Sequence, residues 1–214
     1  CSSDLNAQTQ LGGWVQGNPW LAGGEARVIL NEVNASHPSQ LRGPMEVAGG
    51  RAQVVIANPA GITCDGCGFL NANRVTLTTG TPILNGGNLD GYRVQRGIVE
   101  VTGAGMDSSR ADYTDIIARA VRVNAGLWAS SLQVTTGANE VAASDGATQR
   151  IAGAGAGSAP GYALDVSALG GMYAGKIALV GTEHGLGMRN AGHIGARSEE
   201  HTSELQSRLH LVCR

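Results

Sequence analysis

The residues best suited to chemistry in this 214-residue chain are Cys64 and Cys67, which are separated by two residues. A CxxC pair can bind zinc, exchange disulfides or form a local structural disulfide. Zinc needs about four ligands, and no second close cysteine pair or ligand-spaced histidine pair occurs. A thioredoxin-like redox site needs a strand followed by a helix, which Gly66 and the residues after Cys67 do not predict. The pattern therefore favours a structural disulfide, which requires an oxidising compartment.

The other reactive side chains do not form a recognisable catalytic set. His37, His184 and His193 are far apart, and the chain contains no His-Glu-x-x-His, Gly-x-Ser-x-Gly or phosphate-binding Gly-x-x-x-x-Gly-Lys motif. Asp112 and Asp115 lie three residues apart, but a helix N-cap explains that spacing as well as catalysis does. We predict that the chain is not an enzyme, has no metal site and uses no cofactor.

The composition excludes several classes of partner. Charged residues make up 15% of the chain, against roughly 25% in average globular proteins. The net charge of -2 gives no electrostatic reason to bind nucleic acid or an anionic membrane, and we expect no small-molecule substrate. No run of about 18 apolar residues is present, and no signal peptide follows Cys1. We expect that an export signal was removed or that the sequence starts within its gene.

Short apolar runs separated by turn residues set the expected secondary structure. Each run has about five residues, is rich in Val, Ile and Thr, and is flanked by Gly, Asn or Pro, which is typical of strands. The runs are residues 26–30, 52–57, 74–78, 97–102, 121–124, 131–135 and 176–180. Helical signals are scarce, and residues 112–120 form the most helix-like segment. Residues 153–161, rich in Gly and Ala, predict a flexible surface loop.

The scarcity of aromatic residues separates the possible all-β folds. Aromatics are 4% of the chain, with Phe69 as the single phenylalanine, whereas sandwich cores usually depend on large aromatics. Small stacked cores fit a right-handed parallel β-helix, with asparagine-rich corners at residues 70–73 and 85–88. The predicted core positions are Val28, Leu30, Val54, Ile56, Val75, Leu77, Val99, Val101, Val134, Ile177 and Leu179.

The most informative motif is a turn that opens at Asn58 and Pro59. Proline fixes its own φ angle, and an asparagine side chain can bind the amides that follow it. Gly61 allows a positive φ, and Ile62 returns to the core. A similar turn lies upstream at Asn18 and Pro19, followed by Trp20 and Leu21.

These two turns resemble the paired Asn-Pro motifs of two-partner-secretion (TPS) domains. The family usually has asparagine at the third place of each motif, where this chain has Trp20 and Ala60. The resemblance to this family extends over residues 8–196, where further segments match in the same order as in the family. The segments that carry it are residues 24–33, 38–43, 74–82, 112–119, 169–176 and 188–195. The nearest subgroup is the contact-dependent growth-inhibition exoproteins and other relatives of filamentous haemagglutinin.

The resemblance implies an all-β fold, a right-handed parallel β-helix with an N-terminal β cap, and no catalytic residue. It implies a secretion-targeting domain of a large surface exoprotein, an adhesin or a contact-dependent toxin carrier. The chain would leave by the Sec machinery, cross the periplasm unfolded, and reach the cell surface or the extracellular space. A partner outer-membrane transporter would recognise it through periplasmic domains and a barrel. The positions carried over for recognition or folding are Asn18, Pro19, Leu21, Asn58, Pro59, Gly61 and Ile62.

Two other classes of function stay open. Parallel β-helices also occur in polysaccharide-processing enzymes, which need a cleft with clustered charges, and this chain has one lysine, Lys176. A carbohydrate-binding adhesin module would need exposed aromatic clusters, and Trp14 and Trp20 are the only close tryptophan pair in the sequence.

The last 18 residues differ from everything before them. Residues 197–214 contain no Gly, Ala or Asn, and six of them are charged, against 26 of the preceding 196. Residues 197–207 resemble the conceptual translation of a sequencing-library adapter, although residues 204–209 also have some helical spacing. We therefore predict a natural domain over residues 1–196, N-terminally incomplete, and a non-native tail over residues 197–214.

Sequencing the genomic locus tests this boundary. We expect the codons after Ala196 to continue into further Gly- and Asn-rich strands. Genomic codons for the 18 tail residues directly after Ala196 would show that the tail is native.

Overall fold

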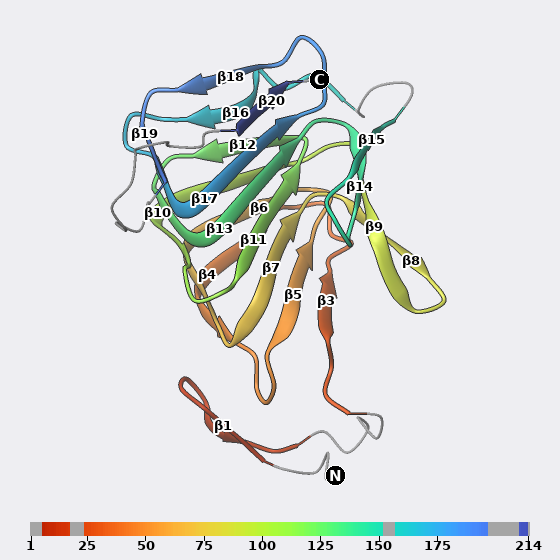
Figure 1. The fold of residues 1–214 in the computed structure, drawn as a ribbon, viewed down its shortest axis with the longest axis vertical. Helices are drawn as coiled ribbons and strands as arrows, with labels where there is room; N and C mark the ends of the chain where they lie inside the picture. Colours follow the sequence, from red (N-terminus) through yellow and green to blue (C-terminus); the bar gives the residue numbers. More distant parts are fainter. Residues whose placement is uncertain (1–5, 18–23, 152–156, 197–209, 214) are drawn as a thin grey trace, which may run out of the picture.

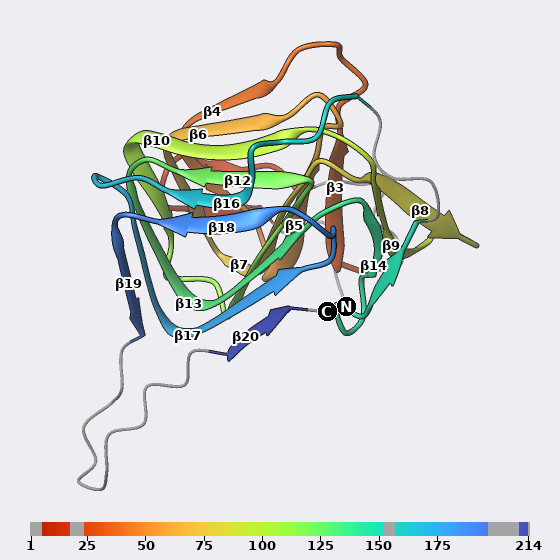
Figure 2. The same ribbon diagram turned by 90° about the horizontal axis from the view of Figure 1, so that it is seen from above.

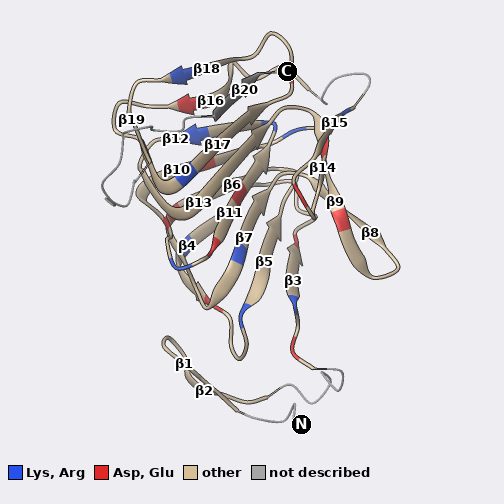
Figure 3. Cartoon of the chain, viewed as in Figure 1, with Lys and Arg blue, Asp and Glu red and all other residues tan. Residues whose placement is uncertain are grey.

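The computed structural model describes residues 6–17, 24–151 and 157–196, and the backbone of residues 210–213. All regular elements in these residues are strands (Figure 1). No helix in them is long and apolar enough to cross a membrane. Charged residues are thinly spread over the strands (Figure 3), as the low charged fraction predicts.

Most strands wind into coils that stack in parallel register. The first face of the coil runs downward through the stack in Figure 2 as β4, β6, β10, β12, β16 and β18. Their bounds are β4 Ser39–Glu46, β6 Ile62–Leu70, β10 Ile98–Ser108, β12 Ala120–Val123, β16 Tyr162–Val166 and β18 Gly187–Asn190. Since every pairing is parallel, each coil adds one strand to this face.

The second and third faces follow in the same way. The second face uses the later parts of β4, β6 and β10, the first parts of β13 and β17, and β19. The third face contains β3, β5, β7, β11, the later parts of β13 and β17, and β20. The bounds are β3 Val28–Glu32, β5 Ala52–Ala57, β7 Ala72–Thr78, β11 Tyr113–Ala118, β13 Gly126–Thr136, β17 Gly171–Gly181, β19 His193–Ala196 and β20 His210–Cys213. The expected right-handed parallel β-helix is confirmed.

Two further units lie outside the coils. Near the N-terminus, β1 (Ala7–Thr9) and β2 (Gly13–Val15) form an antiparallel hairpin, drawn at the bottom of Figure 1. The Glu46 carboxylate accepts hydrogen bonds from the amides of Gln10 and Leu11, both at 2.8 Å. These contacts attach the extra N-terminal strands to the first coil.

The second unit is an antiparallel sheet formed by two insertions that leave the coils at the same corner, between the third and first faces. Its strands are β8 (Thr81–Asn85), β9 (Asn88–Val94), β14 (Asn139–Ala142) and β15 (Thr148–Arg150). It buries a small core against the outside of the third face, made of Val55, Tyr92, Val94, Ile117 and Val141. Burial raises the pKa of Tyr92 to about 12, because the phenolate is poorly solvated there.

The main core lies inside the coils and consists of columns of aliphatic side chains. One column on the third face joins Ile56, Leu77, Ile116, Val134 and Leu179, each 4% exposed or less. Parallel register places equivalent residues of successive coils side by side, so each column repeats one small cross-section.

Eight of the predicted core positions are buried, and Val54 packs partly buried against the same core. Val28 was assigned wrongly, and Leu30 packs partly buried against the small outer core rather than the main core. The register pairs Val28 with Gln53 and Leu30 with Val55, which places both on the outside, and Val28 is 40% exposed. A shift of one residue exchanges the two faces of a strand, and the first strand of a stack has no earlier coil to cover it.

The structure corrects two further sequence-based expectations. The helix-like segment 112–120 forms β11, whose Thr114, Ile116 and Ala118 are buried. The asparagine-rich segment 85–88 is the turn of the β8–β9 hairpin rather than a coil corner, whereas Asn71 does occupy a corner, with φ 56°. Residues 157–161 have no regular structure, and residues 152–156 lie outside the described residues.

The predicted tail is described only in part. Residues 197–209 and 214 lie outside the described residues, and the backbone of β20 pairs with the later part of β17.

Leu77→Ala tests the column directly. The substitution removes a fully buried side chain between Ile56 and Ile116, so we expect the free energy of unfolding to fall by about 2–5 kcal/mol. Val28→Ala is the control and should cost less than about 1 kcal/mol. Equal losses in urea unfolding would contradict the assigned inside and outside of these strands.

Candidate functional site

The Asn58 side chain lies fully buried at the corner between β5 and β6. Its amide nitrogen donates to the carbonyl oxygen of His37 at 3.0 Å and to the hydroxyl of Ser39 at 2.8 Å. Its amide oxygen accepts from the backbone N–H of Ala60 at 2.9 Å. The backbone N–H of Asn58 donates to the carbonyl oxygen of Thr78 at 3.0 Å. One residue thus connects its own turn to the coils before and after it.

The rest of the turn depends on Gly61 and Ile62. Gly61 has φ +127°, and a Cβ atom there would lie 3.0 Å from the carbonyl oxygen of Ile98, so a larger residue would be both strained and crowded. Its N–H donates to the carbonyl oxygen of Asn58, and its own carbonyl accepts from Ser39, both at 3.0 Å. Ile62 is fully buried at the start of β6, in register with Ser39 and Val99.

Ala60, the residue at the third place of this motif, contributes through its backbone. The N–H of Ala60 satisfies the Asn58 amide oxygen, and the Ala60 side chain is partly exposed. Any residue except proline supplies that N–H, which explains how alanine can stand where the family usually has asparagine. Pro59 is likewise partly exposed.

The structure separates the motif residues by exposure. Asn58, Gly61 and Ile62 are buried, so in the folded protein they hold the corner together. Asn18, Pro19 and Leu21 of the upstream turn lie outside the described residues, as does Trp20.

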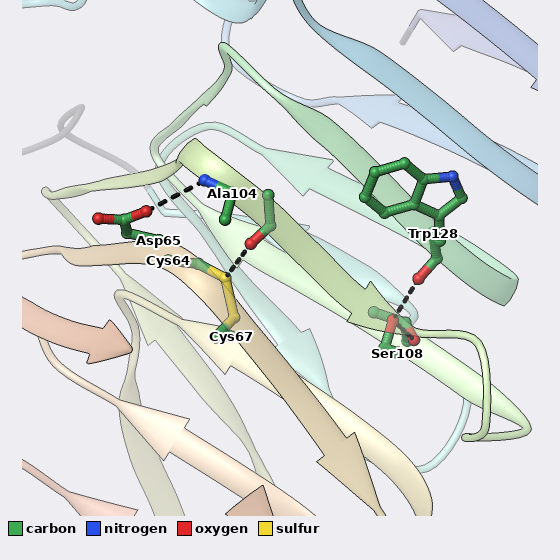
Figure 4. The surroundings of a disulfide bond; sticks show 8 residues. Cys64, Asp65, Cys67, Ala104, Ser108 and Trp128 are labelled. Carbon is green, nitrogen blue, oxygen red and sulfur yellow. Dashed lines mark hydrogen bonds between the residues drawn. A yellow bond between two sulfur atoms is a disulfide. The ribbon is translucent and has the colours of Figure 1, made fainter. Parts of the chain in front are cut away.

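A second corner of the same coil carries the disulfide between Cys64 and Cys67, shown with Asp65 and Ala104 in Figure 4. The two Cα atoms are 5.4 Å apart, and both cysteines belong to the main core, at 0% and 1% exposure. Between them β6 passes from the first face to the second, with Gly66 at φ +73°.

The neighbouring coil shapes the surroundings of the disulfide. The register of β10 on β6 shifts between Thr102 and Met106. As a result, three residues of β10 lie opposite the single residue Gly66 of β6 and form a bulge. This bulge places the carbonyl oxygen of Gly105 3.4 Å from the sulfur of Cys64. The Asp65 carboxylate accepts from the N–H of Ala104 at 3.1 Å. The disulfide is therefore enclosed by backbone and lies inside a coil corner.

Two long-range contacts escaped the sequence-based reasoning. Trp128 and Tyr173, on adjacent coils of the second face, have ring centroids 6.1 Å apart and are 44% and 40% exposed. The Arg119 guanidinium donates to the Glu183 carboxylate at 2.9 Å and 3.1 Å. Hydrogen bonding from Arg119 lowers the pKa of Glu183. Both pairs are more than 40 residues apart in sequence, so no local pattern indicates them.

No group of three His, Cys, Asp or Glu side chains that could hold a metal ion occurs in the part of the chain that the structure describes. Polar side chains at the corner form hydrogen bonds within the fold, and the arrangement is that of a structural corner.

Mass spectrometry of tryptic fragments tests the disulfide. Without reductant, we expect the fragment that contains Cys64 and Cys67 to be two mass units lighter than after reduction, because the bond replaces two thiol hydrogens. Reducing the bond in the unchanged sequence should lower the free energy of unfolding by at most about 2 kcal/mol, because the closed loop is very short. Two free thiols in protein purified from an oxidising compartment would refute the pairing.

The chain matches known proteins over most of its length. The family model of the TPS secretion domain matches residues 5–208. A solved structure, the filamentous hemagglutinin secretion domain, aligns with TM-score 0.81 and 36% identity, covering 89% of this chain and 66% of that one.

Two curated relatives are also similar to this chain over most of its length. "Toxin CdiA" of Yersinia pestis is 62% identical over 191 residues, 88% of this chain and 6% of that protein. "tRNA nuclease CdiA-2" of Burkholderia pseudomallei (strain 1026b) is 47% identical over 210 residues, 97% of this chain and 7% of that protein. The chain thus spans less than a tenth of the length of these relatives. With its β-helix fold and its motif corner, the chain belongs to the family of TPS secretion domains, the secretion-targeting domains of CdiA- and filamentous-haemagglutinin-type exoproteins.

Proposed function

We propose that the Asn58 corner is the folding nucleus on which export of this chain depends. The single observation that carries the proposal is the fully buried Asn58 amide, which forms three side-chain hydrogen bonds, two of them to the preceding coil. A buried polar group is costly unless it is paired. Formation of the Asn58 turn therefore becomes favourable only when residues 37–39 and 58–61 come into contact. This contact completes the first coil.

The partner in this proposal is an outer-membrane transporter. Exoproteins with TPS domains are secreted to the cell surface or the extracellular space. The finer steps are ours: the Sec machinery delivers the chain to the periplasm, and periplasmic domains of the transporter bind it while it is unfolded. Open strand segments add to a sheet edge of the partner, and the chain then passes through the barrel. A coil that folds outside cannot slide back.

The remaining motif residues have separate roles in this proposal. Asn58, Gly61 and Ile62 act in folding, because they are buried in the finished coil. Asn18, Pro19 and Leu21 are assigned to recognition or folding from the family motif. Pro59 limits the unfolded conformations of the turn, because its φ is fixed in both states.

For the whole protein we propose a contact-dependent toxin carrier. The support comes from the relatives, which are named as a toxin and as a tRNA nuclease. We assign no catalytic residue to this chain, so a toxic activity would belong to other parts of the protein. The natural domain in this proposal ends at residue 196. The family match runs on to residue 208, and the boundary rests on the change in composition.

Export assays with a matched pair of variants test the proposal. Asn58→Asp keeps the side-chain shape but loses the two donors to His37 and Ser39. Asn139→Asp makes the same change at another fully buried asparagine, which donates to Thr136 and Thr182. Each substitution should destabilise the folded chain by about 3–5 kcal/mol, because it also buries a carboxylate that faces a carbonyl oxygen.

The chain is expressed behind a Sec signal with and without its cognate outer-membrane transporter, and the medium is assayed. We expect export only with the transporter, and a much larger loss for Asn58→Asp than for Asn139→Asp. Equal export without the transporter would contradict its role. Equal loss for the two variants, at equal stability, would contradict a special role for Asn58.

A further inference from the structure

A cavity of about 570 Å³ lies along the corners between the third and first faces. Pro38 and Ala60, beside the Asn58 turn, form one end, and Ser158 and Pro160 of the loop before β16 form the other. Gly97 and Ala120 supply the corners of the coils between them. The space is within the range of about 300–1,000 Å³ that is typical of small-ligand pockets. We call it the corner cavity.

The walls of the corner cavity carry an unbalanced set of charges. Arg96, Arg119, Arg122 and Glu100 line it. Arg119 is committed to Glu183 and to the carbonyl oxygen of Ser158. The side chains of Arg96 and Arg122 are exposed, and neither forms a hydrogen bond or close ion pair with the residues that the structure describes. Arg122 lies in register between Glu100 and Asp165 and interacts electrostatically with the Asp165 carboxylate. The side chains that line the cavity thus carry three positive charges against one negative charge, in a chain whose net charge is -2.

Glu100 restricts the kind of anion that fits. One of its carboxylate oxygens accepts from the Asn124 amide at 2.8 Å, and the other has no hydrogen-bond partner in the described part of the chain. A simple anion would be repelled by this carboxylate, whereas a ligand with hydroxyl groups can donate to it. Thr63 and Ser158 add hydroxyl groups to the wall, and Pro38, Ile98 and Pro160 add apolar surface.

We propose that the corner cavity binds an acidic saccharide. A carboxylate of the sugar pairs with the guanidinium groups of Arg96 and Arg122, whose planar fork of N–H donors matches a carboxylate. Sugar hydroxyl groups donate to Glu100, and the apolar faces of the sugar rings contact Pro38, Ile98 and Pro160. The cavity exists only in the folded chain, so the ligand is met outside the cell. The proposal goes beyond secretion and does not rest on the role of Asn58.

Isothermal titration calorimetry on the whole chain tests the proposal with trigalacturonate as the probe. Maltotriose is the neutral match, tetraglutamate the acidic peptide, and inorganic phosphate and glucose 6-phosphate are the other anions. We expect trigalacturonate to bind, and to bind less tightly as salt screens the charges. Arg96→Glu and Arg122→Glu should each weaken it by about tenfold or more, since charge-assisted hydrogen bonds are lost.

Arg27→Glu is the matched control, because Arg27 is exposed and lies outside the cavity; it should bind like the parent. Arg96→Glu and Arg27→Glu should unfold at the parent temperature. Arg122→Glu places a carboxylate in register with Glu100 and Asp165 and should unfold at a lower temperature. Arg122→Gln, which should unfold at the parent temperature and bind as weakly as Arg122→Glu, therefore separates lost binding from lost folding. The proposal is overturned if no saccharide binds, or if the cavity variants bind like Arg27→Glu. It is also overturned if maltotriose, tetraglutamate, glucose 6-phosphate or phosphate binds as tightly as trigalacturonate.

Discussion

A chain that winds as a coil must turn at every corner without leaving backbone donors and acceptors unpaired. Near the N-terminal end of the β-helix, the Asn58 amide meets this constraint. It pairs with the turn that it opens and with the corner of the preceding coil. These bonds fix the register in which β6 pairs with β4, and β10 in turn pairs with β6. The column that begins at Ile62 continues through Val99, Val121 and Leu164 in that same register.

Local patterns in the sequence were sufficient for the strands, the fold class and the turn at Asn58. They failed where the deciding partner is distant. The inside and outside of β3 depend on its pairing with β5, so Val28 was misplaced. Residues 112–120 have helical spacing, but Thr114 and Ile116 pair with strands on both sides. The antiparallel outer sheet joins Tyr92 to Val141, a pairing that neither insertion indicates alone. At the site, the turn was predictable, but its contacts with His37 and Ser39 were not.

The same architecture suits a chain that is exported before it folds. Every pairing in the coils joins residues that are distant in sequence, and folds dominated by such contacts form slowly. In the export route that we propose, a slowly folding chain would stay open long enough to be bound and threaded, and its few charges would reduce the cost of passing a narrow barrel. The disulfide between Cys64 and Cys67 encloses two residues only, so it can form early without creating a wide loop. The corner cavity and the stacked rings of Trp128 and Tyr173 form only when the coils close.

Pulsed hydrogen exchange during refolding tests the central claim, that the coil nucleates at the Asn58 corner. The backbone amides of Ser39, Asn58 and Gly61 donate to carbonyls of neighbouring coils or of the turn itself, so their protection reports on this corner. We expect these amides to be protected in the earliest phase, ahead of those in β17 and β18, and the Asn58→Asp variant to delay the whole sequence. Early protection of β17 and β18 with Ser39 and Gly61 still exchanging would contradict the account.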